Sequence, residues 1–413
     1  KYLAFLDGDD LFEEKWLQKA FLLAEKTDKE CVLHPEYYIA FEGKNLIWKR
    51  VSSTDSSFRF GSLLYVNPWD ATIFLNNSIM SRIKFKECPR DSGWGYEDYD
   101  FFCNTLGEGI EHLVVPETVV FIRAKSEGSM LMNYASSNRV LYPNKLFEYE
   151  VLKNLIKDDD QSVSEEKSFK HKTLDRYPKL HLLLWKIKMG VLDYFEVPTR
   201  GSNYPGWLLG EWRNINLIEP ELFPSNRTLR EIVKYSPTFS DLMASIYLNI
   251  YSELGQNLKH LIFVPFIKVG GAEKVLFNFI KVLQEVYPKE EIAIISTEPS
   301  DSPWKDKLSK DITFVDIGNM GGLSYAEKEI LLIRLLIQMH PHNIYNISSI
   351  RTFEILSKYQ KSISENSNIF TFVFCPEYDE QGRISGFAFS YLDKQIDYNK
   401  KIFTDNQRYI DQL

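Results

Sequence analysis

Tyr2-Leu-Ala-Phe-Leu6, followed by Asp7-Gly8-Asp9-Asp10, decides the fold that we expect at the start of this chain. Every residue of the first stretch is apolar, which is typical of a central strand covered on both faces of a sheet. The three carboxylates then stand at the carboxyl end of that strand, where open α/β sheets bind their ligands. The sequence therefore predicts an α/β fold with an acidic site after its first strand.

Three acids within four residues repel one another unless a cation or hydrogen-bond donors satisfy them. Their hard oxygen atoms suit Mn²⁺ or Mg²⁺, so a divalent metal is the natural resolution. A metal held there would grip a diphosphate and neutralise the charge that builds on it as a leaving group. The acidic turn thus indicates metal and phosphate chemistry.

Other structures fit the same turn less closely. Asp9 or Asp10 would be an N-cap if the turn only capped a helix starting at Glu13, and this alternative stays open. An EF-hand loop is excluded, because Leu11 stands at its third acidic position and no glycine follows at the sixth. A phosphatase of the haloacid dehalogenase type also begins with an apolar strand and Asp-x-Asp, but Thr or Val is expected there in place of Leu11.

A second acidic motif, Gly93-Trp94-Gly95-Tyr96-Glu97-Asp98-Tyr99-Asp100, stands at the expected start of a helix. Glycines let the chain approach a ligand closely, and an aromatic face can stack on a sugar ring. Taken alone, the acids also fit a helix N-terminus, which favours negative charge through the helix dipole. Together with the first acidic turn, the motif makes a simple helix N-terminus a weaker explanation and favours a shared acidic site.

The first region, residues 1–145, alternates short apolar runs with helical stretches. A helix is expected over Glu13–Lys26 and a strand over Cys31–His34. This α/β pattern defines a first domain.

The second region, residues 146–255, offers no cluster of chemically useful side chains. A polar, charged stretch over 157–172 is typical of a linker, and helical periodicity dominates from 173 onward. We interpret the region as a mostly helical spacer.

The third region, residues 256–413, alternates strands and helices again. A strand from His260 leads through the glycine turn Val269–Ala272 into a helix over Glu273–Val286, and Ile292–Ser296 is the next strand. The pattern continues with a strand over Ile312–Val315, a helix over Glu327–Met339 and a strand over Asn343–Ile347. This order predicts a Rossmann-like unit.

Composition narrows the class of protein. A chain of 413 residues suits two or three domains, and 44% apolar residues indicate a folded globular protein. The net charge of -8 argues against a nucleic-acid partner, because such proteins usually carry a basic patch. The four cysteines form no C-x-x-C pair, so neither a disulfide framework nor a zinc site is indicated, and a reducing cytoplasm is expected.

No apolar run reaches the roughly 18 residues of a transmembrane helix, which predicts a soluble protein or one peripheral to a membrane. The chain opens at Lys1 in a strand-like run without Met, and it closes just after another such run. Both ends are therefore expected to be cuts through a longer protein.

The two acidic motifs together resemble the pattern of family 2 glycosyltransferases, which have the GT-A fold. That pattern is an apolar strand ending in Asp-x-Asp, then Gly-Trp-x-x-Glu-Asp, then a strand and a tail like Arg123–Met130. The resemblance implies inverting transfer of a sugar from a nucleotide-sugar donor. It implies these roles: Asp7 near the nucleotide, Asp9 and Asp10 on the metal, Asp98 as general base, Glu97 positioning the acceptor, and Trp94, Gly95 and Tyr96 binding it.

Two departures from the family pattern matter. The family begins with a βαβ segment that recognises the nucleotide base, and this chain starts after it, which leaves the activity of the isolated chain open. Many relatives carry a His near the position of Lys125. A protonated Lys cannot ligate a metal but can contact a phosphate oxygen, so Lys125 is assigned to donor binding with its role open.

The third region resembles the amino-terminal lobe of family 4 glycosyltransferases, which have the GT-B fold. Gly270-Gly271-Ala272-Glu273 stands at the turn into the first helix, where backbone amides suit an anion such as the donor phosphate. Phe374–Glu377, Thr404–Asn406 and Trp207–Trp212 resemble parts of proteins that join the two families. A tight βα connection without a ligand explains the glycines equally well. The second lobe of that family would lie beyond Leu413.

The sequence therefore predicts a truncated GT-A domain with a Rossmann-like mixed sheet, a helical spacer and a GT-B N-terminal lobe. The expected function is metal-dependent, inverting transfer of a sugar to a glycan or lipid-linked glycan acceptor in surface polysaccharide biosynthesis. The expected location is the cytoplasm, including peripheral attachment to the inner face of the membrane. The alternative is a non-catalytic glycan-binding or scaffolding module derived from a glycosyltransferase, with Lys125 marking decay of the metal site.

Overall fold

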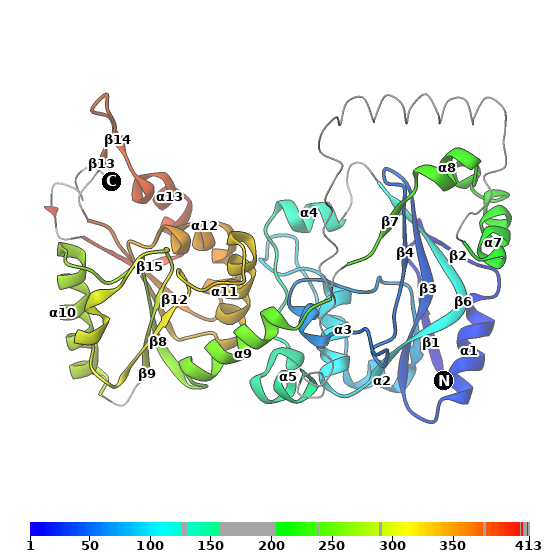
Figure 1. Ribbon diagram of the computed structural model, residues 1–413, viewed down its shortest axis with the longest axis horizontal. Coiled ribbons are helices and arrows are strands. Elements are labelled where there is room, and N and C mark those ends of the chain that lie inside the picture. The colour runs from blue at the N-terminus through cyan, green and yellow to red at the C-terminus, as the bar shows by residue number, and fades with distance from the viewer. Residues whose placement is uncertain are drawn as a thin grey trace, which may run out of the picture.

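The protein, analysed as a computed structural model, consists of two lobes joined by a helical region (Figure 1). The structure describes residues 1–125, 130–156, 204–237, 239–288, 291–374, 377–404, 406–407 and 411. The predicted linker over 157–172 lies outside these residues, and so do Cys375 and Asp405 of the later motifs. The α/β class is confirmed in both lobes.

The first lobe is built on a mixed sheet that has seven strands in the described residues. Its strands are β1 (Tyr2–Phe5), β2 (Leu11–Phe12), β3 (Cys31–Glu42), β4 (Leu46–Lys49), β5 (Ile73–Asn76), β6 (Glu111–Ala124) and β7 (Val233–Tyr235). Its helices are α1 (Trp16–Lys26), α2 (Asn77–Arg82), α3 (Glu97–Gly107), α4 (Met130–Ser136) and α5 (Tyr149–Ile156), with the 3-10 turns η1 (Phe60–Leu64) and η2 (Lys145–Phe147). The long strands β3 and β6 pair in parallel at its centre.

The prediction that the first strand is central and covered on both faces is wrong. In the described part of the chain, β1 pairs only with β5, antiparallel, and forms one edge of the sheet. Leu3 is 36% exposed and Leu6 is 38% exposed. A short apolar run does not by itself distinguish a covered central strand from an edge strand with an open face.

The helix predicted to start at Glu13 begins later, at Trp16. Glu13 is fully buried instead, where its backbone N–H donates to Val119 and its carboxylate accepts from Lys19 at 2.9 Å. The N-cap position is Lys15, and it makes no side-chain capping bond. The alternative that Asp9 or Asp10 caps this helix is therefore wrong.

Helices cover both faces of the first sheet. Odd-numbered residues of β3 point to α1 and α7 (Gly206–Asn216), and even-numbered ones such as Val32 and His34 point to α3 and the aromatic cluster around Trp69. This alternation follows from the period of two in a strand. The face that carries α3 is the one turned toward the second lobe (Figure 1).

A buried histidine pair joins β3 to β6 beneath α3. His34 and His112 share a hydrogen bond of 2.9 Å, His112 is bonded to Thr105 at 2.8 Å, and both rings stack on Trp69. Burial lowers the pKa of His112 to about 3, and burial together with the charges of His112 and Arg50 lowers the pKa of His34 well below 6.5. Both rings are therefore neutral in the folded protein.

This pair predicts a loss of stability in acid. Since the folded pKa values lie below the unfolded value of 6.5, the unfolded chain takes up protons first, and stability present above pH 6.5 is lost as the pH falls toward about 3. Chemical denaturation at several pH values should show this slope, and His112→Gln should flatten it. An equal slope in the variant would contradict the assignment.

The described part of the region between the lobes, residues 204–237 and 239–255, is mostly helical but is not a detached spacer. After α7 come η4 (Pro220–Leu222), α8 (Asn226–Glu231), the strand β7, and α9 (Leu242–Leu254). α7 packs on the first sheet through Leu208 and Trp212, and β7 extends that sheet by pairing in parallel with β4. α9 instead lies between the two lobes (Figure 1).

The second lobe contains a parallel sheet that has six strands in the described residues, and the four strands whose ranges the sequence predicts are among them. Its elements are β8 (Leu258–Val264), α10 (Gly271–Val286), β9 (Glu291–Ser296), η5 (Pro303–Lys307), β10 (Ile312–Asp316), α11 (Tyr325–Met339), β11 (Asn343–Ile347), α12 (Ile350–Ser364), β12 (Asn368–Phe372), α13 (Phe387–Gln395), η6 (Ile396–Tyr398) and β15 (Asn399–Phe403), with a hairpin of β13 (Glu377–Tyr378) and β14 (Ile384–Ser385). The order β10-β9-β8-β11-β12-β15 is the doubly wound Rossmann arrangement.

One apolar core runs from sheet to sheet through the interface. It includes Val32 and Leu75 of the first sheet, Tyr247 of α9, and Leu261 and Phe263 of the second sheet. α9, α11 and α12 line it from the second lobe, whereas α10 covers the opposite face of that sheet (Figure 1). A large apolar interface of this kind opposes relative motion of the lobes.

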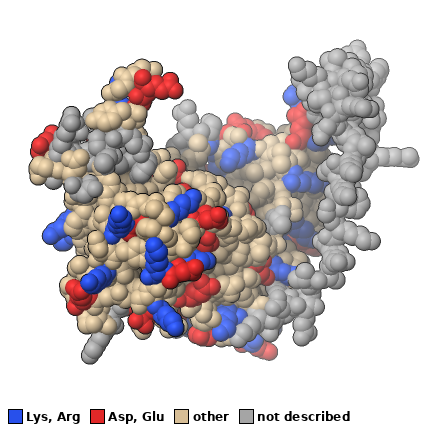
Figure 2. All heavy atoms as spheres, turned by 60° about the vertical axis from the view of Figure 1, so that its left-hand side comes forward, with Lys and Arg blue, Asp and Glu red and all other residues tan. Residues whose placement is uncertain are grey.

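The surface shows no broad basic area on the face in Figure 2, where acidic and basic side chains alternate over the described residues of the second lobe. Cys31, Cys88 and Cys103 are free thiols. None of the helices that the structure describes is long and apolar enough to cross a membrane.

Candidate functional site

Asp10 is the buried member of the first acidic motif, in the turn between β1 and β2. Its backbone N–H donates to Asp7 at 3.1 Å, and its Oδ1 accepts from the backbone N–H of Arg123 at 2.9 Å. Burial, together with the charges of Asp7, Asp9 and Asp70, raises the pKa of Asp10 to about 7 against the opposing effect of the Arg123 amide. These carboxylates are therefore gathered at one place.

Asp9 is paired with a cation of the protein itself. Lys125 Nζ lies 2.7 Å from Asp9 Oδ2, and this hydrogen bond holds the pKa of Asp9 below its usual range. Lys125 follows β6, which ends at Ala124 beside the acidic turn. The sequence left the role of Lys125 open, and the structure places its ammonium group on the first acidic motif.

Asp7 links the first motif to the second. Burial raises its pKa, and the charges of Asp9, Asp70 and Glu97 raise it further. Since Glu97 belongs to the second motif, the two predicted motifs lie close enough for a charge of the second to raise the pKa of Asp7 in the first.

Asp98 stands in the first turn of α3 and is half-buried. Asn67 Nδ2 donates to its Oδ2 at 3.3 Å. Burial raises the pKa of Asp98 to about 7, opposed by the backbone N–H of Tyr99 and assisted by the charges of Glu97 and Asp70. A carboxylate with a pKa near neutrality is well suited to general base catalysis.

The turn before α3 is strained. Tyr96 has φ 63° and ψ 52°, the left-handed region that a bulky residue rarely adopts. Its ring packs against Tyr134 edge to face, and the Tyr134 hydroxyl donates to Glu97 at 3.0 Å. Strain of this kind concentrates at functional sites.

Asp70 is a member of the site that sequence reasoning missed. It lies in the loop before β5, pairs with the buried Arg50, and accepts from the backbone N–H of Thr72 at 2.7 Å. Its charge raises the pKa of Asp10 and of Asp98, so it belongs to the surroundings of both motifs. A lone Asp between two aromatic segments carries no motif that would have identified it.

The small and aromatic residues of the second motif lie elsewhere than expected. Trp94 is 2% exposed, stacks on Tyr142, and donates from Nε1 to Glu365 at 2.7 Å. Its ring is therefore not free to stack on an acceptor sugar in this conformation. Gly95 is needed for close packing, because a Cβ there would lie 3.0 Å from the Arg139 side chain.

The metal-ligand prediction for Asp9 and Asp10 stays a prediction. The donor chemistry fits a divalent cation, since the oxygen ligands are hard, and burial followed by the charges of neighbouring carboxylates raises the pKa of Asp10. Within the described residues, however, no three His, Cys, Asp or Glu side chains are arranged as a metal-binding group. A cation bound through Oδ2 of Asp9 would have to displace the Lys125 ammonium group.

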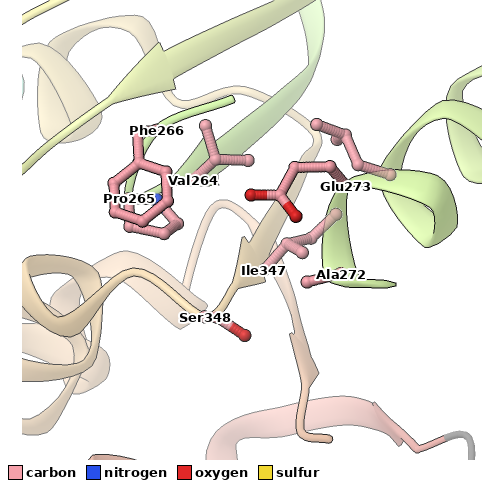
Figure 3. A pocket seen from close by; sticks show the side chains of 8 residues that line it. Val264, Pro265, Phe266, Ala272, Glu273, Ile347 and Ser348 are labelled. Carbon is pink, nitrogen blue, oxygen red and sulfur yellow. The ribbon is translucent and has the colours of Figure 1, made fainter. Parts of the chain in front are cut away.

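The glycine turn of the second lobe borders a small pocket. Gly270 is the N-cap of α10, and the pocket is lined by Ala272, Glu273 and the ends of β8 and β11. Figure 3 shows the Glu273 carboxylate pointing into it, between Val264 and Ile347. The pocket lies where the strand order reverses, which is the usual ligand position in doubly wound sheets.

Glu273 already places negative charge at this turn. Its Oε1 accepts from the backbone N–H of Lys268 at 3.5 Å, and a Cβ at Gly270 would lie 2.3 Å from its Oε2. Gly271, by contrast, has open space around its Cα. A phosphate bound at the start of α10 would have to displace or compete with the Glu273 carboxylate.

Comparisons with known proteins add no relative. No family model matches the chain, and neither the curated proteins nor the solved structures contain a match.

Proposed function

We propose that the first lobe is a metal-dependent, inverting glycosyltransferase domain of the family 2, GT-A type, and that the second is a family 4, GT-B type N-terminal lobe. The observation that carries the proposal is the convergence of the two acidic motifs. Besides burial, the charge of Glu97 raises the pKa of Asp7, and the charge of Asp70 raises the pKa of both Asp10 and Asp98. The donor is a nucleotide sugar and the acceptor a glycan or lipid-linked glycan. The proposed setting is surface polysaccharide synthesis on the cytoplasmic side.

Asp98 acts as the general base in this proposal. It takes the proton of the acceptor hydroxyl as that oxygen attacks the donor sugar. Its raised pKa of about 7 keeps the base strong while leaving it largely ionised slightly above neutrality. Asn67 orients the carboxylate through its hydrogen bond to Oδ2.

Asp9 and Asp10 are the residues that would hold Mn²⁺ or Mg²⁺. The ion, when bound, stabilises the negative charge on the departing nucleoside diphosphate. Lys125, displaced from Asp9, then becomes available to a phosphate oxygen, which a protonated amine binds well.

Removing Lys125 should strengthen metal binding. In Lys125→Ala, Asp9 loses the ammonium group that competes with a cation, so we expect Mn²⁺ to bind about two- to fivefold more tightly, the range of an exposed ion pair. Isothermal titration calorimetry measures the change. Lys44→Ala, which removes an exposed lysine from the turn after β3, controls for net charge. Unchanged or weaker binding would argue against Asp9 as a ligand.

The function itself is tested with the natural protein at its full length. Calorimetry with a panel of nucleoside diphosphates, with and without Mn²⁺, should show binding that depends on the metal, and a labelled nucleotide sugar should yield a glycan product. Release of phosphate from a simple monoester would instead favour the phosphatase alternative.

A non-catalytic glycan-binding module is the second candidate, and the Lys125 to Asp9 ion pair favours it because a lysine occupies a predicted metal ligand. The same titration separates the two. Glycan binding without any metal-dependent nucleotide binding would support the module.

A further inference from the structure

The second lobe clamps the segment that leads into the candidate base. Ser362 Oγ of α12 donates to the carbonyl of Gly93 at 2.9 Å, and Trp94 Nε1 donates to Glu365 Oε2 at 2.7 Å. Gly93 lies so close that a Cβ there would stand 2.7 Å from the backbone nitrogen of Ser362. The end of α12 therefore fixes the backbone five residues before Asp98.

The first lobe holds the same segment from its other side. Gly95 donates to the carbonyl of Val140 at 3.1 Å, and Val140 donates to that of Gly93 at 3.0 Å. Arg139 donates to the carbonyl of Trp94 at 3.0 Å. The strained Tyr96 follows directly, so its conformation is imposed by contacts from both lobes.

A second contact runs from α11 to α3. The side-chain oxygen of Gln338 accepts from the backbone N–H of Asn144 at 2.9 Å. Asn144 in turn donates from Nδ2 to Asp100 at 3.1 Å, and Asp100 is fully buried two residues after Asp98. The start of α3 is thus fixed by the second lobe along two independent routes.

We propose that Glu365 and Ser362 are positioning residues for the Glu97 and Asp98 carboxylates, so that sugar transfer in the first lobe depends on contacts from the second. This rests on the proposed function. Neither residue touches the acidic site; each acts through the Gly93 to Tyr96 segment. A misplacement of about 1 Å at a reacting group lowers rates strongly, so loss of these contacts would slow the reaction.

Glu365→Ala tests the proposal, because Glu365 is exposed and its loss spares the core. We expect kcat to fall about tenfold with little change in KM for the donor, since geometry rather than binding is altered. Glu365→Gln keeps an acceptor for Trp94 and should restore most of the rate. Glu285→Ala on α10, at the far side of the lobe, is the matched control (Figure 1). A wild-type kcat in Glu365→Ala would overturn the proposal.

Hydrogen exchange separates this inference from the proposed function. The amides of residues 93–99 should exchange faster in Glu365→Ala than in the unaltered protein and Glu285→Ala, whether or not a sugar is transferred. If the unaltered protein transfers no sugar, the proposed function fails and the catalytic part of the inference fails with it, while faster exchange would still establish the clamp. Unchanged exchange together with an unchanged rate would refute the inference alone.

Discussion

Replacing Asp98 by Asn should lower sugar transfer by roughly 10²- to 10⁴-fold, the usual contribution of a general base, while the protein stays folded. The amide keeps the shape of the carboxyl group and its contact with Asn67 but cannot accept the proton of the acceptor hydroxyl. Transfer of a labelled sugar by the natural protein at full length measures the loss. Asp91→Asn, an exposed neighbour at the start of the same loop, should leave the rate unchanged.

Stability and pH provide independent checks on Asp98. Burial raises its folded pKa from 3.8 to about 7, so stability that is present below pH 3.8 is lost as the pH rises through 7. The Asn variant has no carboxylate to ionise in this buried position, so it should melt at an equal or higher temperature at pH 8. Transfer by the unaltered protein should fall below about pH 7, where Asp98 is protonated, although Asp10 titrates in the same range. Full activity of Asp98→Asn would rule out this base.

Replacing Tyr247 by Ala should destabilise both lobes at once, by about 3–5 kcal/mol as for other large aromatic deletions. The side chain is fully buried in the core that runs from sheet to sheet, and its hydroxyl donates to the carbonyl of Phe147 at 2.8 Å. Its removal leaves a cavity and an unsatisfied carbonyl. Chemical denaturation should show one transition at lower denaturant, with faster hydrogen exchange in both α3 and β8.

A surface tyrosine provides the control for this experiment. Tyr378 is 52% exposed in β13, so Tyr378→Ala should change the free energy of unfolding by less than about 0.5 kcal/mol. Two separate transitions in Tyr247→Ala, with only one lobe affected, would show that the lobes do not share their stability.

Four strands of the second sheet were predictable because each is a mostly apolar run within an alternation of strands and helices. Ile292–Ser296 and Asn343–Ile347 are strands near the predicted bounds, and α11 begins at Tyr325 behind the capping residue Ser324. The edge position of β1 was not predictable, since pairing partners are set by segments far along the chain. The same applies to β7, a short exposed strand within an otherwise helical region.

The candidate site could be predicted only in part, because its members come from segments that lie far apart in the chain. The acidic motifs pointed to Asp7, Asp10, Glu97 and Asp98 because neighbouring carboxylates repel one another unless a cation or hydrogen-bond donors satisfy them. Asp70 joins them only through the folding of its loop, and no local pattern marks it. Trp94 donates to Glu365 across 271 positions of sequence, so an indole predicted to face a ligand faces the other lobe instead.

The core that joins the lobes also limits how such proteins can be rearranged. A lobe transplanted alone into another protein would carry the apolar faces of α3 or of α9 and α11 into water, and exposed apolar areas of this size promote aggregation. Gene fusions and domain exchanges should therefore preserve the pair. Engineering of one lobe has to treat its neighbour as part of the same folding unit.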